Sequence, residues 1–291
     1  MVQPKTIGII GLGSAGMRHA KNLLAMGHTV WGYDPNSSAL VLFNELGGKP
    51  LAKMWGNERT FDGIVIASPT KSHLGHLKTT THWKRPVLVE KPIADEVDWD
   101  IDLRQVMVGC NLRFHACVKK AKEWIKGGSI GDLICGSFTV FQFNDKYTES
   151  CILNWGAHEC DLALYFLGPA TVTGATGSHD WANILCLHEY GVPSIIHCEY
   201  RTPIERRVFS IMGTKGNIDV DLVRRDSYLS RGGDGDQIFK ADDSFDENYK
   251  DEMQAFIDLI DGKPVPHAAT GQDGLNCLEL ILEAKKMAGI A

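Results

Sequence analysis

One stretch decides how the N-terminal part of the chain folds: Thr6-Ile7-Gly8-Ile9-Ile10-Gly11-Leu12-Gly13-Ser14-Ala15-Gly16. Its first five residues predict a short buried strand, and helix-forming residues follow the last glycine. In a Gly-x-Gly-x-x-Gly turn the first glycine permits a tight bend. The second lets backbone N–H groups approach a pyrophosphate, and the third lets the helix pack on the strand. The stretch therefore predicts a dinucleotide-binding turn made by Gly11, Gly13, Ser14, Ala15 and Gly16.

Short apolar runs and helical stretches alternate on both sides of this turn up to about residue 110. The predicted strands are Lys5–Ile10, Thr29–Tyr33, Gly63–Ala67 and Val87–Glu90, and the predicted helices are Ala15–Met26 and Ser72–Trp83. Continuous apolar strands separated by helices indicate a parallel sheet that is covered on both faces. We therefore expect residues 1–112 to form an α/β dinucleotide-binding domain of the Rossmann type.

The pattern changes after about Asn111, where runs of alternating, β-branched and aromatic residues become frequent. The predicted strands are 136–143, 182–188, 194–200, 208–212 and 218–221, the predicted helices are 117–126, 158–167, 246–260 and 275–288, and an exposed loop is predicted for 231–243. Turn signals such as Gly213-Thr214-Lys215-Gly216 join neighbouring strands. Residues 113–291 therefore predict an α+β domain with a mostly antiparallel sheet.

Composition excludes several classes of protein. The 291 residues are 44% hydrophobic and 23% charged, as in ordinary globular proteins, and the net charge of −6 offers no basic surface for nucleic acid. No apolar run reaches the ~18 residues of a membrane span, and the N-terminal residues lack a signal-peptide pattern. The eight cysteines contain no Cys-x-x-Cys pair, which argues against a zinc ribbon or a disulfide framework. We expect a soluble cytoplasmic protein without a metal site.

Asp34 ends the second predicted strand, 18 residues after Gly16. A carboxylate at this position can accept hydrogen bonds from both hydroxyls of an adenosine ribose. No Arg or Lys follows within 35–38. Since the carboxylate would repel a 2′-phosphate and no cation is at hand to neutralise it, NAD is favoured over NADP.

Two further segments carry chemistry. Glu90-Lys91-Pro92 follows a predicted strand at the sheet edge where ligands of open α/β sheets bind, so the Lys91 ammonium would face the nicotinamide end of the cofactor. In residues 154–161, Asn154 and His158 share one helix face, as do His158 and Asp161. A histidine can remove a hydroxyl proton while a cation steadies the charge on oxygen, which suits alcohol oxidation. We expect Lys91 and His158 to meet over the nicotinamide ring.

The chain resembles the Gfo/Idh/MocA oxidoreductases almost from end to end. The segments that carry the resemblance are 11–19, 67–73, 90–92, 109–114, 128–131, 156–161 and 213–216. The resemblance implies a Rossmann domain followed by an α+β domain with a large open sheet that supports homodimers or homotetramers. It also implies that Lys91 lies between cofactor and substrate and that His158 is the acid/base. The residues it places on the nicotinamide side are Ser68, Pro69, His73 and Glu90.

The sequence departs from the family pattern in two places. Asn154 stands where family members that act on inositol-like substrates usually carry Asp, and an amide cannot hold a proton as a carboxylate does. This favours a modified sugar, such as an amino, uronic or nucleotide-linked one, over a simple polyol. The second departure is the segment from Pro92 to Val108, which is too short for the long helix that the family usually places there and predicts only a turn or two.

The remaining candidates are substrate contacts and alternative functions. Asn154, Trp155 and Asp161 are candidate carbohydrate contacts, and Arg113 is either a pocket-edge or a structural residue. His158-Glu159 without a second His at i+4 does not fit the metalloprotease pattern, so no metal is expected. The sequence favours an NAD-dependent sugar dehydrogenase. A non-catalytic NAD-binding sensor and an NAD-assisted eliminating glycosidase carry the same motifs and stay open.

Overall fold

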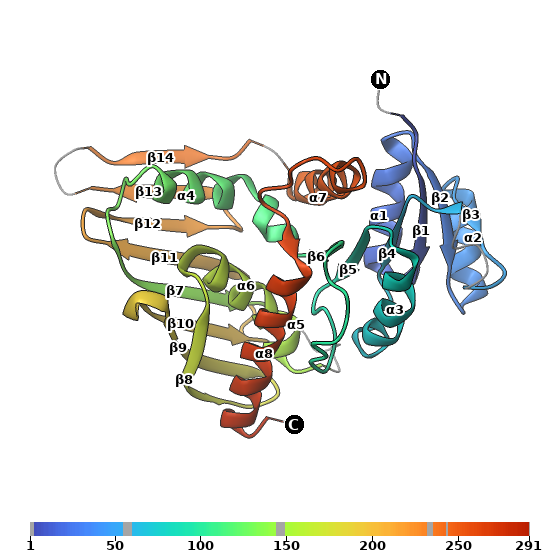
Figure 1. Ribbon diagram of the computed structural model, residues 1–291. Helices are drawn as coiled ribbons and strands as arrows, with labels where there is room; N and C mark the ends of the chain where they lie inside the picture. The colour runs from blue at the N-terminus through green and yellow to red at the C-terminus, as the bar shows by residue number, and fades with distance from the viewer. Residues whose placement is uncertain (1–2, 55–59, 144–148, 232–234, 243, 291) are drawn as a thin grey trace. The chain divides into compact units, whose positions relative to one another are not determined.

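The computed structural model describes residues 3–54, 60–143, 149–231, 235–242 and 244–290. The chain forms two compact units, drawn in Figure 1. Unit 1 comprises Met1–Phe114 and Phe245–Leu275, and unit 2 comprises His115–Ser244 and Asn276–Ala291.

Unit 1 is built on a seven-stranded sheet in the order β15-β6-β5-β4-β1-β2-β3. Its strands are β1 (Thr6–Ile10), β2 (Thr29–Tyr33), β3 (Lys49–Pro50), β4 (Gly63–Ile66), β5 (Val87–Glu90), β6 (Val106–Gly109) and β15 (Ala269–Thr270). All neighbouring strands pair in parallel except β15, which pairs antiparallel to β6. The predicted α/β sheet is confirmed, and β1, β2, β4 and β5 lie where the apolar runs predict them.

Helices and short 3-10 turns within the described residues accompany this sheet. They are α1 (Ser14–Ala25), α2 (Ser37–Glu45), α3 (His73–Thr80), α7 (Phe245–Ile260), η2 (Thr70–Ser72), η3 (Thr81–Trp83) and η4 (Asn111–Phe114). From Pro92 to Gln105 the chain forms turns and bends without a helix, as its short length predicts.

Helix α7 differs from the predicted domain division, which assigned all of 113–291 to the second domain. Its buried Met253, Phe256 and Ile257 belong to the same apolar core as Ile9 and Leu88 of unit 1. An amphipathic helix gains most of its stability by burying its apolar face, so the partner face rather than chain order decides where it lies. The residues 245–275 therefore return to unit 1.

Unit 2 is built on an eight-stranded sheet in the order β14-β13-β12-β11-β7-β10-β9-β8. Its strands are β7 (Leu133–Phe141), β8 (Ala170–Gly177), β9 (Trp181–His188), β10 (Pro193–Glu199), β11 (Arg206–Gly213), β12 (Gly216–Asp221), β13 (Asp226–Ser230) and β14 (Gln237–Lys240). Only the β7–β10 pair is parallel, which confirms the mostly antiparallel sheet. β14 lies inside the segment 231–243 that was predicted to be a loop. Residues 232–234 and 243 of that segment lie outside the described residues.

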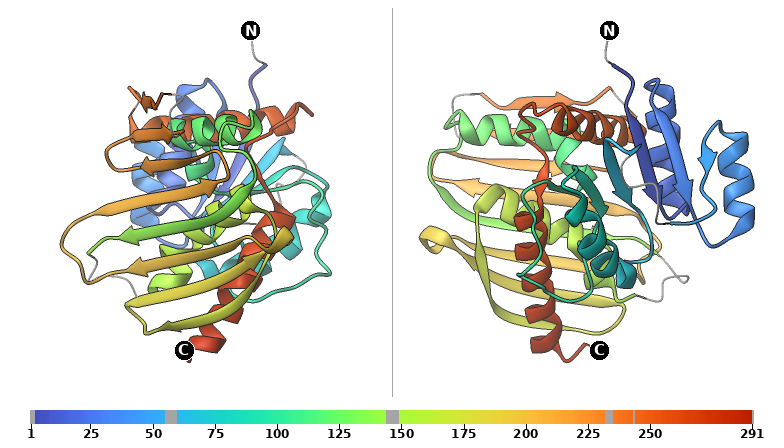
Figure 2. Two further views of the ribbon diagram at one scale, coloured as in Figure 1. Left: turned by 90° about the vertical axis from the view of Figure 1, so that its left-hand side faces the viewer. Right: turned by 45° about the vertical axis from the view of Figure 1, so that its right-hand side comes forward.

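Helices cover one face of this sheet and leave the other face open, as Figure 2 shows in its left view. The helical elements of unit 2 are α4 (Ala116–Lys126), α5 (Cys151–Asn154), α6 (Gly156–Leu167), η5 (Glu189–Gly191) and most of α8 (Gly271–Ala288). Strand residues such as Ile196, Phe138 and Phe209 are buried, and Leu185 and Ile195 are exposed. Among the described residues, no helix combines the length and the apolar character that a membrane span requires.

Candidate active site

The glycine turn has the geometry that its spacing predicts. Gly11 has φ +91°, and a Cβ there would lie 2.6 Å from the Ala67 carbonyl oxygen. A Cβ on Gly16 would lie 2.0 Å from the Gly11 carbonyl oxygen, so only glycine allows α1 to start this close to β1. A Cβ on Gly13 would meet nothing within 4 Å. Gly13 therefore leaves open space at the N-terminus of α1, where backbone N–H groups favour an anion.

Asp34 ties the end of β2 to this turn. Its carboxylate accepts hydrogen bonds from the Leu12 N–H, at 2.7 Å, and from the Asn36 N–H, at 2.8 Å. Each carboxylate oxygen can accept more than one hydrogen bond, so ribose hydroxyls can still bind. The open cradle at Gly13 and the fixed carboxylate at Asp34 together fit the pyrophosphate and the adenosine ribose of a dinucleotide.

The difference between Gly13 and Gly16 gives a matched pair of variants. Gly13→Ala is expected to keep the thermal midpoint of the wild type and to weaken NADH binding by about tenfold or more, or about 1.4 kcal/mol, because its methyl group occupies the cradle. Gly16→Ala is expected to lower the thermal midpoint because its methyl group clashes with backbone. Fluorescence titration with NADH and thermal unfolding measure both effects. Unchanged NADH affinity in Gly13→Ala would contradict the assignment.

His73 links the segments that follow β4 and β5. It is buried, its Nε2 lies 2.7 Å from the Ser68 carbonyl oxygen, and its Nδ1 lies 2.9 Å from the Pro92 carbonyl oxygen. The Ser68 hydroxyl lies 3.0 Å from His76 Nδ1. Burial and then the charge of His73 lower the pKa of His76, which favours a neutral imidazole that accepts this bond. His73 thus fixes two loops of unit 1.

Glu90 ends β5 immediately before Lys91, whose side chain is partly exposed. The Nε2 atom of His19 lies 2.6 Å from Glu90 Oε1. Burial opposes ionisation of Glu90. The hydrogen bond from His19 and the positive charges of His19, Lys91 and His73 outweigh that effect and lower its pKa. Glu90 is therefore ionised, and its negative charge interacts with the positive charge of the neighbouring Lys91.

The remaining candidate residues lie on α5 and α6 of unit 2. His158 is 9% exposed, and the Trp155 ring centroid lies 6.4 Å from its ring centroid. The guanidinium of Arg207 lies 5.0 Å from the Trp155 ring centroid, and its Nε lies 3.0 Å from the buried Glu159 carboxylate. This ion pair places a cation against one face of Trp155 and so restrains the indole beside His158. Sequence reasoning missed Arg207, because β11 carries no motif that marks it.

Asn154 and Asp161, the other two candidates of this unit, are nearly buried on the same two helices. Arg113 lies in unit 1 and is only 4% exposed. Its Nη1 is 3.3 Å from the Asp273 carboxylate. Of the two roles that the sequence left open for Arg113, the burial of its side chain and its ion pair with the partly exposed Asp273 support the structural one.

Two family models match the chain. Residues 5–105 match the model described as an oxidoreductase family with an NAD-binding Rossmann fold, and residues 118–219 match the model of the GFO/IDH/MocA C-terminal domain. Together they cover more than two thirds of the sequence. The chain belongs to the Gfo/Idh/MocA oxidoreductases. The predicted family, the two-part fold and the NAD cofactor are thereby confirmed.

Relatives of known activity are similar over nearly the whole length of this Gfo/Idh/MocA chain. The myo-inositol 2-dehydrogenase of Thermotoga maritima is 24% identical, with 96% of this chain and 95% of the relative covered. The scyllo-inositol 2-dehydrogenase (NAD(+)) of Bacillus subtilis is 22% identical, with 89% and 86% covered. Among solved structures, a levoglucosan dehydrogenase in complex with NADH has a TM-score of 0.88 at 16% identity, with 99% of this chain and 97% of that chain covered. The UDP-N-acetylglucosamine 3-dehydrogenase GnnA of Acidithiobacillus ferrooxidans has a TM-score of 0.83 at 17% identity, with 98% of both chains covered.

Proposed function

We propose that this oxidoreductase is an NAD-dependent dehydrogenase that interconverts a hydroxyl and a carbonyl group on a sugar or sugar derivative. The observation that carries the proposal is the order of the strands in unit 1. β1, β4 and β5 are neighbours, and their carboxyl ends carry the glycine turn, Ser68 and Lys91 in that order. Ligands of open parallel sheets bind beyond this edge, so a cation stands on the same edge as the dinucleotide cradle.

In the proposed reaction, NAD would be held at the glycine turn and Asp34 and would supply the acceptor for the hydride of the substrate carbon. Lys91 donates a hydrogen bond to the reacting substrate oxygen and stabilises the negative charge that develops there. His158 takes the proton of the same hydroxyl group, so that the C–H and O–H bonds break as the carbonyl forms. His73 contacts the Pro92 carbonyl next to Lys91, and the Glu90 carboxylate, bonded to His19, provides a negative charge beside Lys91. Trp155 offers a flat surface for a sugar ring beside His158.

The substrate class rests on the relatives and on one residue of this chain. The relatives named above act on inositols, levoglucosan or a nucleotide-linked sugar. Asn154 offers an amide that both donates and accepts hydrogen bonds but carries no charge. We therefore favour a modified sugar, such as an amino, uronic or nucleotide-linked one, over a simple inositol.

A panel of substrates tests this function. Purified protein is mixed with NAD and, separately, with inositols, free aldoses, anhydro sugars, uronic acids and nucleotide-linked amino sugars, and NADH is followed by its absorbance. At least one modified sugar is expected to give steady turnover, with NAD preferred to NADP. Binding of NADH without turnover on any carbohydrate would favour a sensor, and a cleaved product without net NADH would favour an eliminating glycosidase.

We further propose that the open face of the unit 2 sheet joins two copies of the chain. One row of paired residues crosses this face from Leu185 through Ile195 and Ser137 to Ser210. Leu185 and Ile195 are 49% and 41% exposed. Apolar residues that lie side by side on an exposed sheet, as Leu185 and Ile195 do, favour association, and a second copy presents the same pair. A homodimer, or a homotetramer built from such dimers, follows.

The variant Ile195→Asp tests this interface. A charge at this position, between Leu185 and Ser137 in the proposed interface, is expected to raise the dimer dissociation constant by about a hundredfold, or about 2.7 kcal/mol, because the carboxylate loses its hydration. Light scattering after size-exclusion chromatography measures the mass. Ile204→Asp is the matched control, since Ile204 is exposed in the turn that follows β10. Equal masses for wild type and Ile195→Asp would contradict the interface.

A cytoplasmic location is also part of our proposal. Seven of the eight cysteines are buried, and Cys135 is partly exposed. Buried thiols behave as small apolar side chains and suit a reducing compartment. Fractionation of the native host followed by detection of the protein would check this, and recovery outside the cytoplasm would contradict it.

A further inference from the structure

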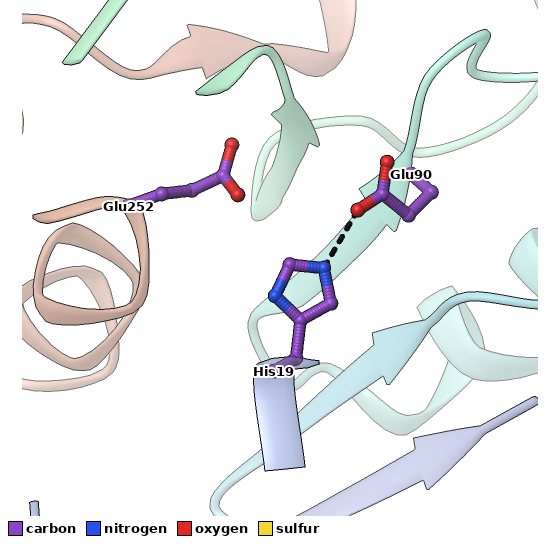
Figure 3. Close-up of side chains that lie close together, drawn as sticks. All are labelled: His19, Glu90 and Glu252. Atoms are coloured by element: carbon purple, nitrogen blue, oxygen red, sulfur yellow. Dashed lines mark hydrogen bonds and ion pairs between the residues drawn. The ribbon is translucent and has the colours of Figure 1, made fainter. Parts of the chain in front are cut away.

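Three ionisable side chains from three elements of unit 1 meet in its interior. They are His19 on α1, Glu90 at the end of β5 and Glu252 on α7, and one nitrogen or oxygen atom of each lies within 4.8 Å of those of the other two. Figure 3 shows the carboxyl group of Glu252 pointing toward His19 and Glu90. The residues His19 and Glu252 are 0% exposed.

The two carboxyl groups of this cluster differ in their hydrogen bonding. His19 and Glu90 are joined at 2.6 Å, whereas neither carboxyl oxygen of Glu252 has a hydrogen-bond partner within the described part of the chain. The neighbouring turn of α7 contributes Met253 and Phe256 to the apolar core. A carboxylate in such surroundings loses its hydration and receives no hydrogen bond in exchange.

Electrostatics assigns one negative charge to the cluster. Two carboxyl groups this close in a buried place cannot both ionise, and the better compensated one does so. Glu90 receives the His19 hydrogen bond and the positive charges of Lys91 and His73. Burial, and then the charge of Glu90, raise the pKa of Glu252 well above its usual value. On α1, the Arg18 guanidinium lies over the Tyr249 ring of α7. The positive charges that could compensate a carboxylate here, those of His19, Lys91 and His73, therefore act on Glu90.

A metal ion is the other occupant that these residue types suggest. Two donors bound to one tetrahedral zinc ion at about 2.0–2.2 Å lie roughly 3.3 Å apart. The 2.6 Å separation of His19 Nε2 and Glu90 Oε1 is a hydrogen-bond distance instead, so the two atoms share a proton.

We propose that Glu252 is a positioning residue: it carries a proton at neutral pH and thereby leaves Glu90, held by His19, as the single charged carboxylate of this cluster beside Lys91. A second negative charge on Glu252 would repel Glu90 and compete with it for the positive charges of Lys91 and His73, which would loosen the segment that carries the ammonium. This inference rests on the proposed function only where it assigns Lys91 to the reaction.

The proton on Glu252 gives a definite dependence of stability on pH. Since its pKa is raised in the folded state, the folded protein binds more protons than the unfolded chain between the usual pKa of Glu and the raised one. Stability from this group is complete below that window and is lost as pH rises through it. Relative to a Glu252→Gln variant, the wild type is expected to lose up to about tenfold in its folding equilibrium constant per pH unit.

Infrared difference spectroscopy tests the proton directly. The spectrum of wild type minus Glu252→Gln at pH 7 is expected to contain the C=O stretch of a protonated carboxylic acid. The control Glu247→Gln removes a partly exposed carboxylate that pairs with Lys250 on the same helix, and should give carboxylate bands only. Should Glu252→Gln not fold, the same band is followed in wild type, where it should disappear as pH rises. A spectrum without an acid band overturns the proposal, whether or not the dehydrogenase function holds.

The effect on Lys91 is measured separately. With a substrate from the panel, Glu252→Gln is expected to lack one alkaline inflection of the wild-type kcat profile, whereas Glu247→Gln keeps it. Superimposable profiles for wild type and Glu252→Gln would mean that Glu252 only supports the fold. A thermal midpoint that rises with added Zn²⁺ or Mn²⁺ in wild type but not in Glu252→Gln would identify a metal site and overturn the proton assignment.

Discussion

The Lys91→Met variant is expected to turn substrate over about 10²–10³-fold more slowly than the wild type, the usual cost of losing one donor to a developing oxyanion. Methionine keeps the length of the side chain and removes the charge. The glycine turn and Asp34, which we propose as the dinucleotide cradle, are unchanged in this variant. NADH affinity should therefore change much less than kcat, and the loss should appear in kcat and kcat/KM alike.

A matched control separates charge at the reaction from charge on the surface. Lys71→Met removes an exposed lysine from η2 of the same unit and should keep wild-type kcat. Lys91→Arg keeps the positive charge, but a planar guanidinium cannot reproduce the position of an ammonium, so only part of the rate should return. Wild-type kcat in Lys91→Met would remove Lys91 from the chemistry.

Local pattern was sufficient to predict four of the seven strands of the unit 1 sheet. β1, β4 and β5 are continuous apolar runs that the sheet buries almost throughout, and such runs are visible in a sequence without any knowledge of their neighbours. β2 alternates between buried and partly exposed residues, which also predicts a strand. The glycine turn could also be predicted from sequence, because its Gly-x-Gly-x-x-Gly spacing is local. A side chain at Gly11 or Gly16 would clash with backbone, and Gly13 leaves open space.

Three strands of unit 2 were not predicted: β8, β13 and β14. β13 is internal and alternates in burial, whereas the other two lack that local signal. β8 and β14 are the two edges of the sheet, and most of their residues are partly or fully exposed. An edge strand has one neighbour and buries few side chains, so its sequence need not alternate strongly. β14 was therefore predicted to be a loop, although its backbone pairs with β13.

Candidate site residues could likewise be predicted only where a local sequence motif marks them. Ser68, His73, Glu90 and Lys91 lie in short motifs, whereas Glu252 reaches His19 and Glu90 only because α7 returns to unit 1. The apolar spacing of Met253, Phe256 and Ile257 predicts a buried helix face. It does not reveal that a carboxyl group on that face stands near another acid, because contacts between distant segments form only with the fold.

The His158→Gln variant is expected to lower kcat by about 10²–10⁴-fold, the range for a lost general acid/base, because an amide cannot exchange the hydroxyl proton. NADH affinity should stay at the wild-type value, since the cradle at Gly13 and Asp34 lies in the other unit of the chain. His179→Gln is the control, because this histidine is exposed in unit 2 and pairs with Asp180. Single-turnover measurement of NADH formation gives the chemical step free of product release.

The double variant Lys91→Met/His158→Gln then decides whether the two side chains serve one reaction. Residues that act as a unit on the same bond lose much less in combination than the product of their separate losses. We therefore expect the double variant to be hardly slower than the worse single variant. Losses that simply multiply would mean that Lys91 and His158 contribute to different steps. Equal rates for wild type and His158→Gln would leave a folded NAD-binding protein whose base is a different residue.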